Sequence, residues 1–281
     1  MLAGCGSSDP PIEPEFAFIE QDADGRLLLT LVEGEREERT QIESRYRPLG
    51  ALGCTGEGLV ALDAVISNRL TSPLVLDGDE VEPLDWAPAG VGPAWFPEGR
   101  LAYHADDGAG NLYIAIAHLA EESVERGPRG RLPAWVPGLG LAAFQGGPPD
   151  GYDRIGVYTY ELSGDAPPEL LSSLPFPTDQ LSPDGTTFVY LSASQENAQR
   201  DLLAIGIDGG DHRTLTATPE QEEMPRWTAD GDVIFVRQPL LDQRETLADA
   251  RDALVVRLDP ASGDERVIAT AGSVLALAPC H

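Results

Sequence analysis

A repeated segment is the feature of this sequence that most constrains its fold. Each copy leads through a Pro or polar residue to a tryptophan or leucine, turns at a glycine, and continues as alternating apolar strands around a variable loop. Trp95, Trp135, Leu181 and Trp227 are equivalent, and they follow one another at intervals of 40, 46 and 46 residues. Repeats of this length are typical of the four-stranded blades of β-propellers.

Two weaker copies complete the array. One begins near Leu52, and the other is split between the chain ends, where residues 16–42 supply three strands and Leu277-Ala-Pro279 matches Leu181-Ser-Pro183. Closing a ring in this way removes the two exposed sheet edges of an open array. The sequence therefore predicts an all-β fold: a six-bladed β-propeller of four-stranded antiparallel blades over residues 15–281, closed by the C-terminal strand joining the N-terminal blade.

Composition agrees with short strands and limits the partners. The chain of 281 residues has 30 Gly and 24 Pro, and its formal net charge is −28. All 19 basic residues are Arg, so a P-loop lysine or a Schiff-base lysine is excluded. Such an acidic chain repels phosphate backbones, which argues against nucleic acid as a partner. The charge indicates a solvated acidic surface, with an acidic binding patch as the alternative.

The first residues predict a lipid anchor. Leu2-Ala3-Gly4-Cys5 resembles the lipobox of bacterial lipoproteins, in which the cysteine becomes the lipidated first residue. Only four residues precede Cys5, so the charged and apolar parts of a signal peptide are missing, and a chance match is the alternative. We expect lipidation at Cys5, a flexible tether over residues 1–14, and a place in the cell envelope, facing the periplasm or the surface. Because residue 6 is Gly rather than Asp, the outer membrane is favoured.

The other two cysteines form an even pair. In an oxidising compartment Cys54 and Cys280 are expected to form a disulfide, although two buried free thiols are the alternative. In the repeat register they occupy like positions on the inner strands of neighbouring blades. No CxxC motif and no Cys/His cluster with metal spacing occurs.

Three stretches resemble a known repeat: LSPDGTTFVYLS, RDLLAIGIDGGDHRTLT and MPRWTADGDVIFV are similar to the TolB-type β-propeller repeat, also found in propellers of prolyl-oligopeptidase relatives. The resemblance covers residues 15–281 and implies the propeller fold. TolB has an additional α/β domain before its propeller, whereas here about a dozen residues precede the first strand, so a Tol-Pal role is not carried over. The peptidase relatives have a hydrolase domain with a nucleophilic serine, and no GxSxG motif occurs here.

Acidic residues beside glycines are predicted to turn the chain rather than to do chemistry. At Asp184-Gly185 and Asp230-Gly231 the glycine allows a positive φ and the aspartate accepts backbone N–H bonds. Calcium is the alternative for three other clusters, although none completes an EF-hand loop: Asp22/Asp24, Asp77/Asp79/Glu80 and Asp106/Asp107/Asn111.

The histidines have no ligand-like spacing: they are His104, His118, His212 and His281. His104 precedes two aspartates, so it is the first candidate for a ligand or base. A structural histidine is the simpler interpretation.

Long loops predict where a partner binds. Residues 145–153, 192–200 and 237–251 occupy the same between-strand position in their blades, so we expect them on one rim of the ring. With no catalytic motif, we predict no catalytic, metal or cofactor residue. The chain is interpreted as a monomeric, lipid-anchored, non-enzymatic scaffold that binds an envelope protein, peptide or glycan. The alternative is an envelope lyase or lactonase with a metal or acid/base site in the central funnel.

Overall fold

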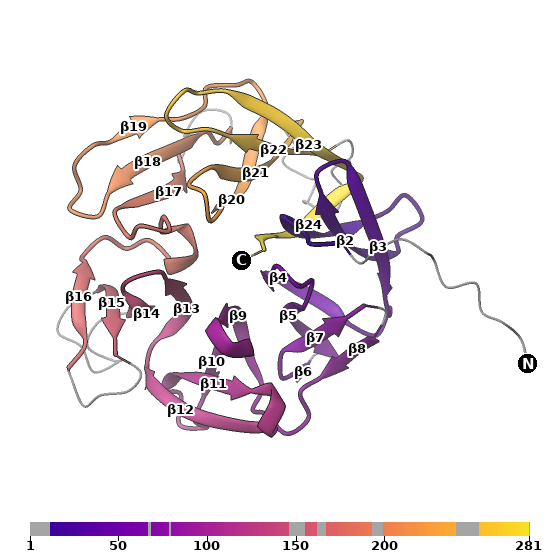
Figure 1. The fold of residues 1–281 in the computed structure, drawn as a ribbon, viewed down its shortest axis with the longest axis vertical. Coiled ribbons are helices and arrows are strands. Elements are labelled where there is room, and N and C mark those ends of the chain that lie inside the picture. Colours follow the sequence, from indigo (N-terminus) through magenta and orange to yellow (C-terminus); the bar gives the residue numbers. More distant parts are fainter. Residues whose placement is uncertain are drawn as a thin grey trace, which may run out of the picture.

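Six antiparallel sheets surround a central axis in the computed structural model (Figure 1). The structure describes residues 12–66, 69–78, 80–145, 155–161, 167–192, 199–239 and 253–280. The predicted six-bladed propeller is confirmed. The strands of each blade are called first to fourth, counted outward from the axis.

The strands follow one another as meanders. Blade 1 consists of β24 (Ser273–Pro279), β1 (Phe16–Gln21), β2 (Leu27–Glu33) and β3 (Arg36–Ile42). Blade 2 consists of β4 (Arg47–Cys54), β5 (Val60–Ile66), β7 (Leu74–Asp77) and β8 (Glu80–Pro83), with β6 (Arg69–Leu70) also paired to β5. Blade 3 consists of β9 (Gly90–Phe96), β10 (Arg100–Asp106), β11 (Leu112–His118) and β12 (Ser123–Arg129).

The second half of the ring repeats this plan. Blade 4 consists of β13 (Arg131–Val136), β14 (Gly140–Gln145), β15 (Gly156–Tyr160) and β16 (Glu169–Ser172). Blade 5 consists of β17 (Thr187–Leu191), β18 (Leu202–Gly206) and β19 (Arg213–Thr214). Blade 6 consists of β20 (Gln221–Trp227), β21 (Val233–Gln238), β22 (Ala253–Leu258) and β23 (Glu265–Ala271). Short 3₁₀ turns are η1 (Pro97–Gly99), η2 (Leu119–Glu121) and η4 (Thr178–Gln180).

Blade 5 departs from the predicted four strands at its innermost position. There the chain forms η4 and then a single bridge between Leu181 and Phe188, in place of a full first strand. Pro175 and Pro177 precede this segment, and proline has no N–H to donate to a sheet ladder. The local sequence therefore shortens the inner strand at this point of the ring.

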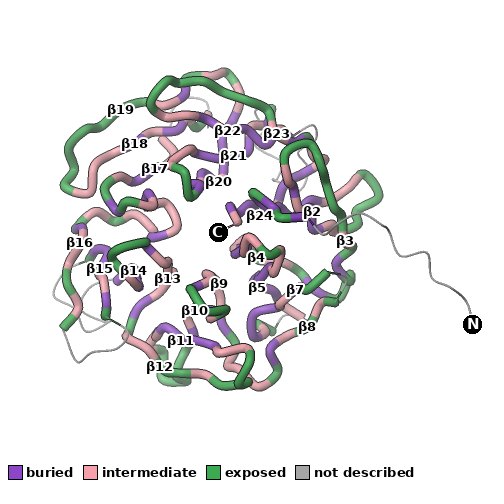
Figure 2. Tube along the Cα trace, viewed as in Figure 1, coloured by how far each residue is buried: buried purple, intermediate pink, exposed green. Residues whose placement is uncertain are grey.

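Neighbouring blades are held together by apolar side chains between their faces. Phe18 and Val32 of blade 1 pack with Val236 and Val255 of blade 6 in one buried cluster. Full burial of such a side chain stabilises the fold by about 1.5–3 kcal/mol. Second strands such as β1 and β21 are almost entirely buried, whereas outer strands such as β3 are mostly exposed (Figure 2).

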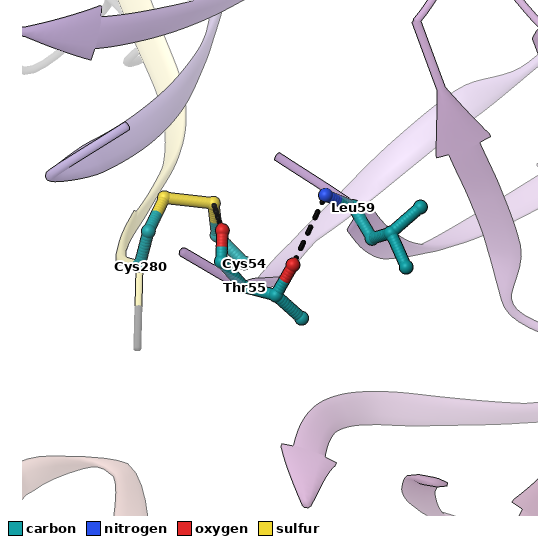
Figure 3. The surroundings of a disulfide bond; sticks show 4 residues. All are labelled: Cys54, Thr55, Leu59 and Cys280. Atoms are coloured by element: carbon teal, nitrogen blue, oxygen red, sulfur yellow. Dashed lines mark hydrogen bonds between the residues drawn. A yellow bond between two sulfur atoms is a disulfide. The ribbon is translucent and has the colours of Figure 1, made fainter. Parts of the chain in front are cut away.

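The chain ends close the ring as predicted. β24 pairs antiparallel with β1 from Phe16 opposite Pro279 to Gln21 opposite Ser273, and the C-terminus lies near the centre of the ring (Figure 1). Beside this seam Cys54 and Cys280 are joined by a disulfide bond, with their Cα atoms 4.4 Å apart (Figure 3). The bond ties the ends of the first strands of blades 1 and 2.

The Asp-Gly pairs make the tight turns that the sequence predicts. Asp184 accepts hydrogen bonds from the Ser182 hydroxyl at 2.6 Å and the Thr186 backbone N–H at 3.0 Å, and these bonds lower the pKa of Asp184, with that from Ser182 contributing most. Gly185 has a φ of +70°, which a glycine adopts without strain. Chain reversal accounts for these residues.

Packing of the N-terminal segment begins before the predicted boundary at residue 15. Ile12 and Pro14 are buried, and Pro14 lies near Gly58 in the first turn of blade 2. Glu15 donates its N–H to the carbonyl of Val32 and accepts a hydrogen bond from the N–H of Cys280, both in blade 1. Cys5 lies outside the described residues. Within the described part of the chain, no helix is long and apolar enough to cross a membrane.

Candidate functional site

A cavity of about 260 Å³ lies on the axis of the ring, and we call it the canal. Its wall is mainly apolar and includes three of the four tryptophans of the chain, Trp95, Trp135 and Trp227. Every blade contributes: the lining segments are 51–54, 92–95, 132–137, 178–183, 226–229 and 278–279, with some gaps. The canal is therefore the point at which side chains from distant repeats meet.

A recurring β-bulge shapes the canal wall. Gly92, Leu132 and Met224 have φ values of +70°, +51° and +54°, and each stands directly before a proline and three residues before a tryptophan. The pairing register of each first strand shifts at this place. A bulge bends a strand and frees its backbone groups from the ladder, so the tryptophan that follows is set on the canal side of the bend.

Polar side chains on second strands bind the freed backbone groups of the first strands. The Asp63 carboxylate on β5 accepts hydrogen bonds from the N–H of Ala51 at 3.0 Å and of Gly92 at 3.3 Å. His104 on β10 accepts a hydrogen bond at Nδ1 from the N–H of Leu132, also at 3.3 Å. Burial raises the pKa of Asp63, and burial together with the charge of Arg131 lowers the pKa of His104 to about 4. His104 therefore has a structural role: its hydrogen bond with Leu132 joins blade 3 to blade 4.

The charged groups of the canal wall are paired with each other. The carboxylate of Asp179 in η4 forms an ion pair with the guanidinium of Arg226 in blade 6, at 2.9 Å. The Nε1–H of Trp227 donates to the carbonyl of Gln180 at 3.0 Å. These contacts cross the gap that the shortened inner strand of blade 5 leaves, and they give the canal one polar side.

A second cavity, of about 590 Å³, lies between blades 6 and 1 where the N-terminal segment enters. Arg257 forms its centre and binds Asp232 at 2.6 Å, Glu15 at 3.3 Å, and also Asp230. Because Arg257 is surrounded by carboxylates, it joins the blade 6 turn to the N-terminal segment. These ion pairs give Arg257 and its carboxylate partners a structural role.

A buried ion-pair network in blade 6 was not anticipated. Glu222 has no exposed surface and accepts a hydrogen bond from Arg237 at 2.8 Å, while Arg237 also contacts Glu265 at 2.7 Å. Glu223 binds Arg200 at 3.0 Å. The sequence feature that could have indicated this network is the pair of adjacent glutamates directly before Met224 and Pro225. They lie on a first strand, where most side chains are buried and a charged one therefore needs a partner.

The remaining candidates from the sequence lie apart. His212 contacts the Tyr190 hydroxyl at 2.5 Å on blade 5, and His118 lies 3.7 Å from Glu125 on blade 3. His281 and most of the three long loops lie outside the described residues, as does Asp79. Among the described residues, no three His, Cys, Asp or Glu side chains are grouped so as to hold a metal ion.

The possible calcium loops have the hydrogen bonds of turns. Asp22 accepts bonds from the N–H groups of Asp24 and Arg26, each at 2.9 Å. Asp107 accepts bonds from the N–H groups of Ala109 and Asn111, and the bond from Ala109 contributes most to lowering its pKa to about 2. The carboxylates thus stabilise their own hairpins.

The fold is a six-bladed β-propeller that is similar to the TolB structure. Over 97% of this chain and 69% of the other, the structure matches that of TolB from Acinetobacter baumannii with a TM-score of 0.62 and 18% sequence identity. A puromycin hydrolase (TM-score 0.45, 15% identity, 94% and 46% coverage) and an oligogalacturonate lyase in complex with manganese (0.45, 14%, 92% and 75%) are more distant. No family model matches the chain. No curated protein matches its sequence.

Proposed function

We propose that this protein is a lipid-anchored, non-enzymatic scaffold of the bacterial cell envelope that binds a protein, peptide or glycan segment at its canal. The observation that carries the proposal is the canal wall, where tryptophans from three blades line one cavity beside the Asp179–Arg226 ion pair. Aromatic faces provide large apolar contacts and a polar edge, which suits both sugar rings and peptide side chains. A rigid ring would hold these groups in place for a partner to bind.

The size of the canal restricts what enters it. Small-molecule pockets are typically about 300–1,000 Å³, and the canal has about 260 Å³. It therefore suits one side chain or one sugar ring of a longer partner rather than a separate cofactor-sized molecule. The rest of the partner would lie on the rim around the opening.

The position of the N-terminal segment supports an orientation for the anchored ring. Glu15 contacts Cys280, where the turns between first and second strands lie. Ile12 follows Cys5 by seven positions, a stretch that spans at most about 25 Å. A lipid at Cys5 would hold this end of the ring near the membrane.

Binding is tested with arrays of glycans and of overlapping envelope-protein peptides, probed with the labelled protein. We expect Trp135→Ala to weaken binding at least tenfold, because it removes an aromatic face from the canal. Trp86→Ala is the matched control, since Trp86 packs outside the canal in blades 2 and 3. Equal binding by Trp135→Ala and the unchanged protein would contradict the proposal. Cleavage of an arrayed glycan would identify the lyase alternative, and hydrolysis of a lactone added separately would identify the lactonase.

The anchor is tested in the same protein by metabolic labelling with palmitate and membrane fractionation. We expect label and membrane association when the chain is expressed behind a lipoprotein signal peptide, and neither when that chain carries Cys5→Ser. A Cys5→Ser protein that remains in the membrane fraction would exclude lipidation as the cause of association.

A further inference from the structure

The contact between His104 and the canal wall depends on the protonation state of the imidazole ring. Leu132 lines the canal, and its N–H donates to the Nδ1 atom of His104 at 3.3 Å. A neutral imidazole nitrogen accepts such a bond, whereas a protonated one is itself a donor. The bond between blades 3 and 4 therefore exists in only one protonation state of His104.

The imidazole lies against the bulge of the neighbouring first strand. A side-chain carbon at Gly92 would lie 3.3 Å from Nδ1 of His104 and 3.4 Å from the Leu132 side chain, so both side chains lie close to Gly92. Gly92 in turn donates its N–H to Asp63 at 3.3 Å. Blades 2, 3 and 4 are thus linked through two adjacent bulges of the canal wall.

The surroundings favour the neutral ring. Arg131 from β13 is the charged group that acts on His104, and Asp63 from β5 lies beyond Gly92. The cross-strand neighbours of His104, Val91 on β9 and Ile114 on β11, carry no charge. Because the pKa of His104 is lowered to about 4, the unfolded chain binds a proton more readily than the folded chain. Stability is therefore lost as the pH falls from about 6.5 toward 4.

We propose that His104 is an acid-sensitive latch on the canal wall. Proton uptake from solvent at Nδ1 replaces an acceptor by a donor, so that two donors face each other at Leu132 and the bond breaks. The first strand of blade 4, which carries Leu132, Pro133 and Trp135, is then free to shift at the canal. The latch goes beyond the binding proposal and does not depend on what the canal holds.

Tryptophan fluorescence measures the latch directly, because three of the four tryptophans line the canal. Emission and far-UV circular dichroism are recorded for the full chain from pH 7 to 3.5. We expect an emission change with a midpoint within about one unit of the His104 pKa, while the far-UV signal stays constant. A tryptophan change that appears only together with loss of the far-UV signal would overturn the proposal.

Matched variants assign the change to His104. The amide oxygen of His104→Gln can accept the Leu132 N–H but does not titrate, so this variant should lose the emission change. His118→Gln, at a half-buried position on blade 3 away from the canal, should retain it, because all the carboxylates that titrate in this range are still present. An unchanged transition in His104→Gln would refute the latch.

A second variant keeps the test decisive if His104→Gln does not fold. Trp135→Phe in the otherwise unchanged chain removes the reporter on the strand that is expected to move. Loss of at least half of the acid-dependent emission change would support the latch. A change of full size in Trp135→Phe would place the movement elsewhere and overturn the proposal.

Discussion

Single polar side chains stabilise the canal wall by binding its free backbone N–H groups. Asp63 is almost fully buried, yet it connects the bulge of its own blade to that of the next through the N–H groups of Ala51 and Gly92. A buried N–H without an acceptor costs about 1–3 kcal/mol. The carboxylate thus compensates for the breaks in the ladder that the bulges introduce.

Asp63→Asn should lower the free energy of unfolding by about 1–3 kcal/mol, because one acceptor oxygen is replaced by an amide donor facing a backbone donor. Urea unfolding at pH 7 measures the difference. Asp24→Asn, at an exposed turn position, is the control and should change stability by less than about 0.5 kcal/mol. Equal midpoints for the Asp63 and Asp24 variants would show that the bulges do not need this acceptor.

At the scale of an element, the turn between first and second strands varies from blade to blade. In blades 5 and 6 it is an Asp-Gly turn, whereas in blade 3 Glu98 has a φ of +65° and precedes Gly99 at +68°. Left-handed backbone at a residue other than glycine or asparagine is strained. The Glu98 side chain is exposed, and its carboxylate lies 3.9 Å from the Arg100 guanidinium. Such an exposed ion pair contributes little to the stability of the fold.

Glu98→Asn should therefore raise the free energy of unfolding by about 0.5–1 kcal/mol, because Asn-Gly is the favoured pair where both turn residues have positive φ. Thermal or urea unfolding at pH 7 provides the measurement. Glu98→Gln removes the charge but keeps the backbone preference, so it separates the two effects. A gain in Glu98→Gln equal to that in Glu98→Asn would point to charge rather than backbone strain.

Strands and turns could be predicted from the sequence where the residues that determine them lie close together in the chain. The strands around LSPDG and TADGD were predicted because alternation and turn residues lie within a few positions. The incomplete inner strand of blade 5 was missed, although Pro175 and Pro177 were visible, because Leu181 still matched the repeat. The burial of two glutamates in β20 was not predicted, because their partners are distant in the sequence. Glu222 pairs with Arg237 on the next strand of blade 6, and Glu223 pairs with Arg200 of blade 5.

At the scale of the whole molecule, closure determines stability. The two chain ends meet as β24 and β1, and the Cys54–Cys280 bond spans a sequence separation of 226 residues. A covalent link that closes so long a loop restricts the unfolded chain more than the folded one. It stabilises the ring at the place where noncovalent closure depends on a single strand pair.

Replacing both cysteines by serine should lower the free energy of unfolding by about 2–4 kcal/mol, measured from urea midpoints under non-reducing conditions. The ring should still close, because the pairing of β24 with β1 does not require the bond. Reduction of the unchanged protein with dithiothreitol should produce the same loss. No effect of either treatment would mean that the two thiols do not form a disulfide in solution.

The sequence by itself determined the repeat, the number of blades, the turns and the pairing of the chain ends, because these depend on local patterns that recur at a regular interval. Only the tertiary structure decided the canal, the bulges that shape it and the role of His104. The reason is physical: the canal wall forms where side chains from six repeats meet, and contacts such as that between His104 and Leu132 join residues 28 positions apart on different blades.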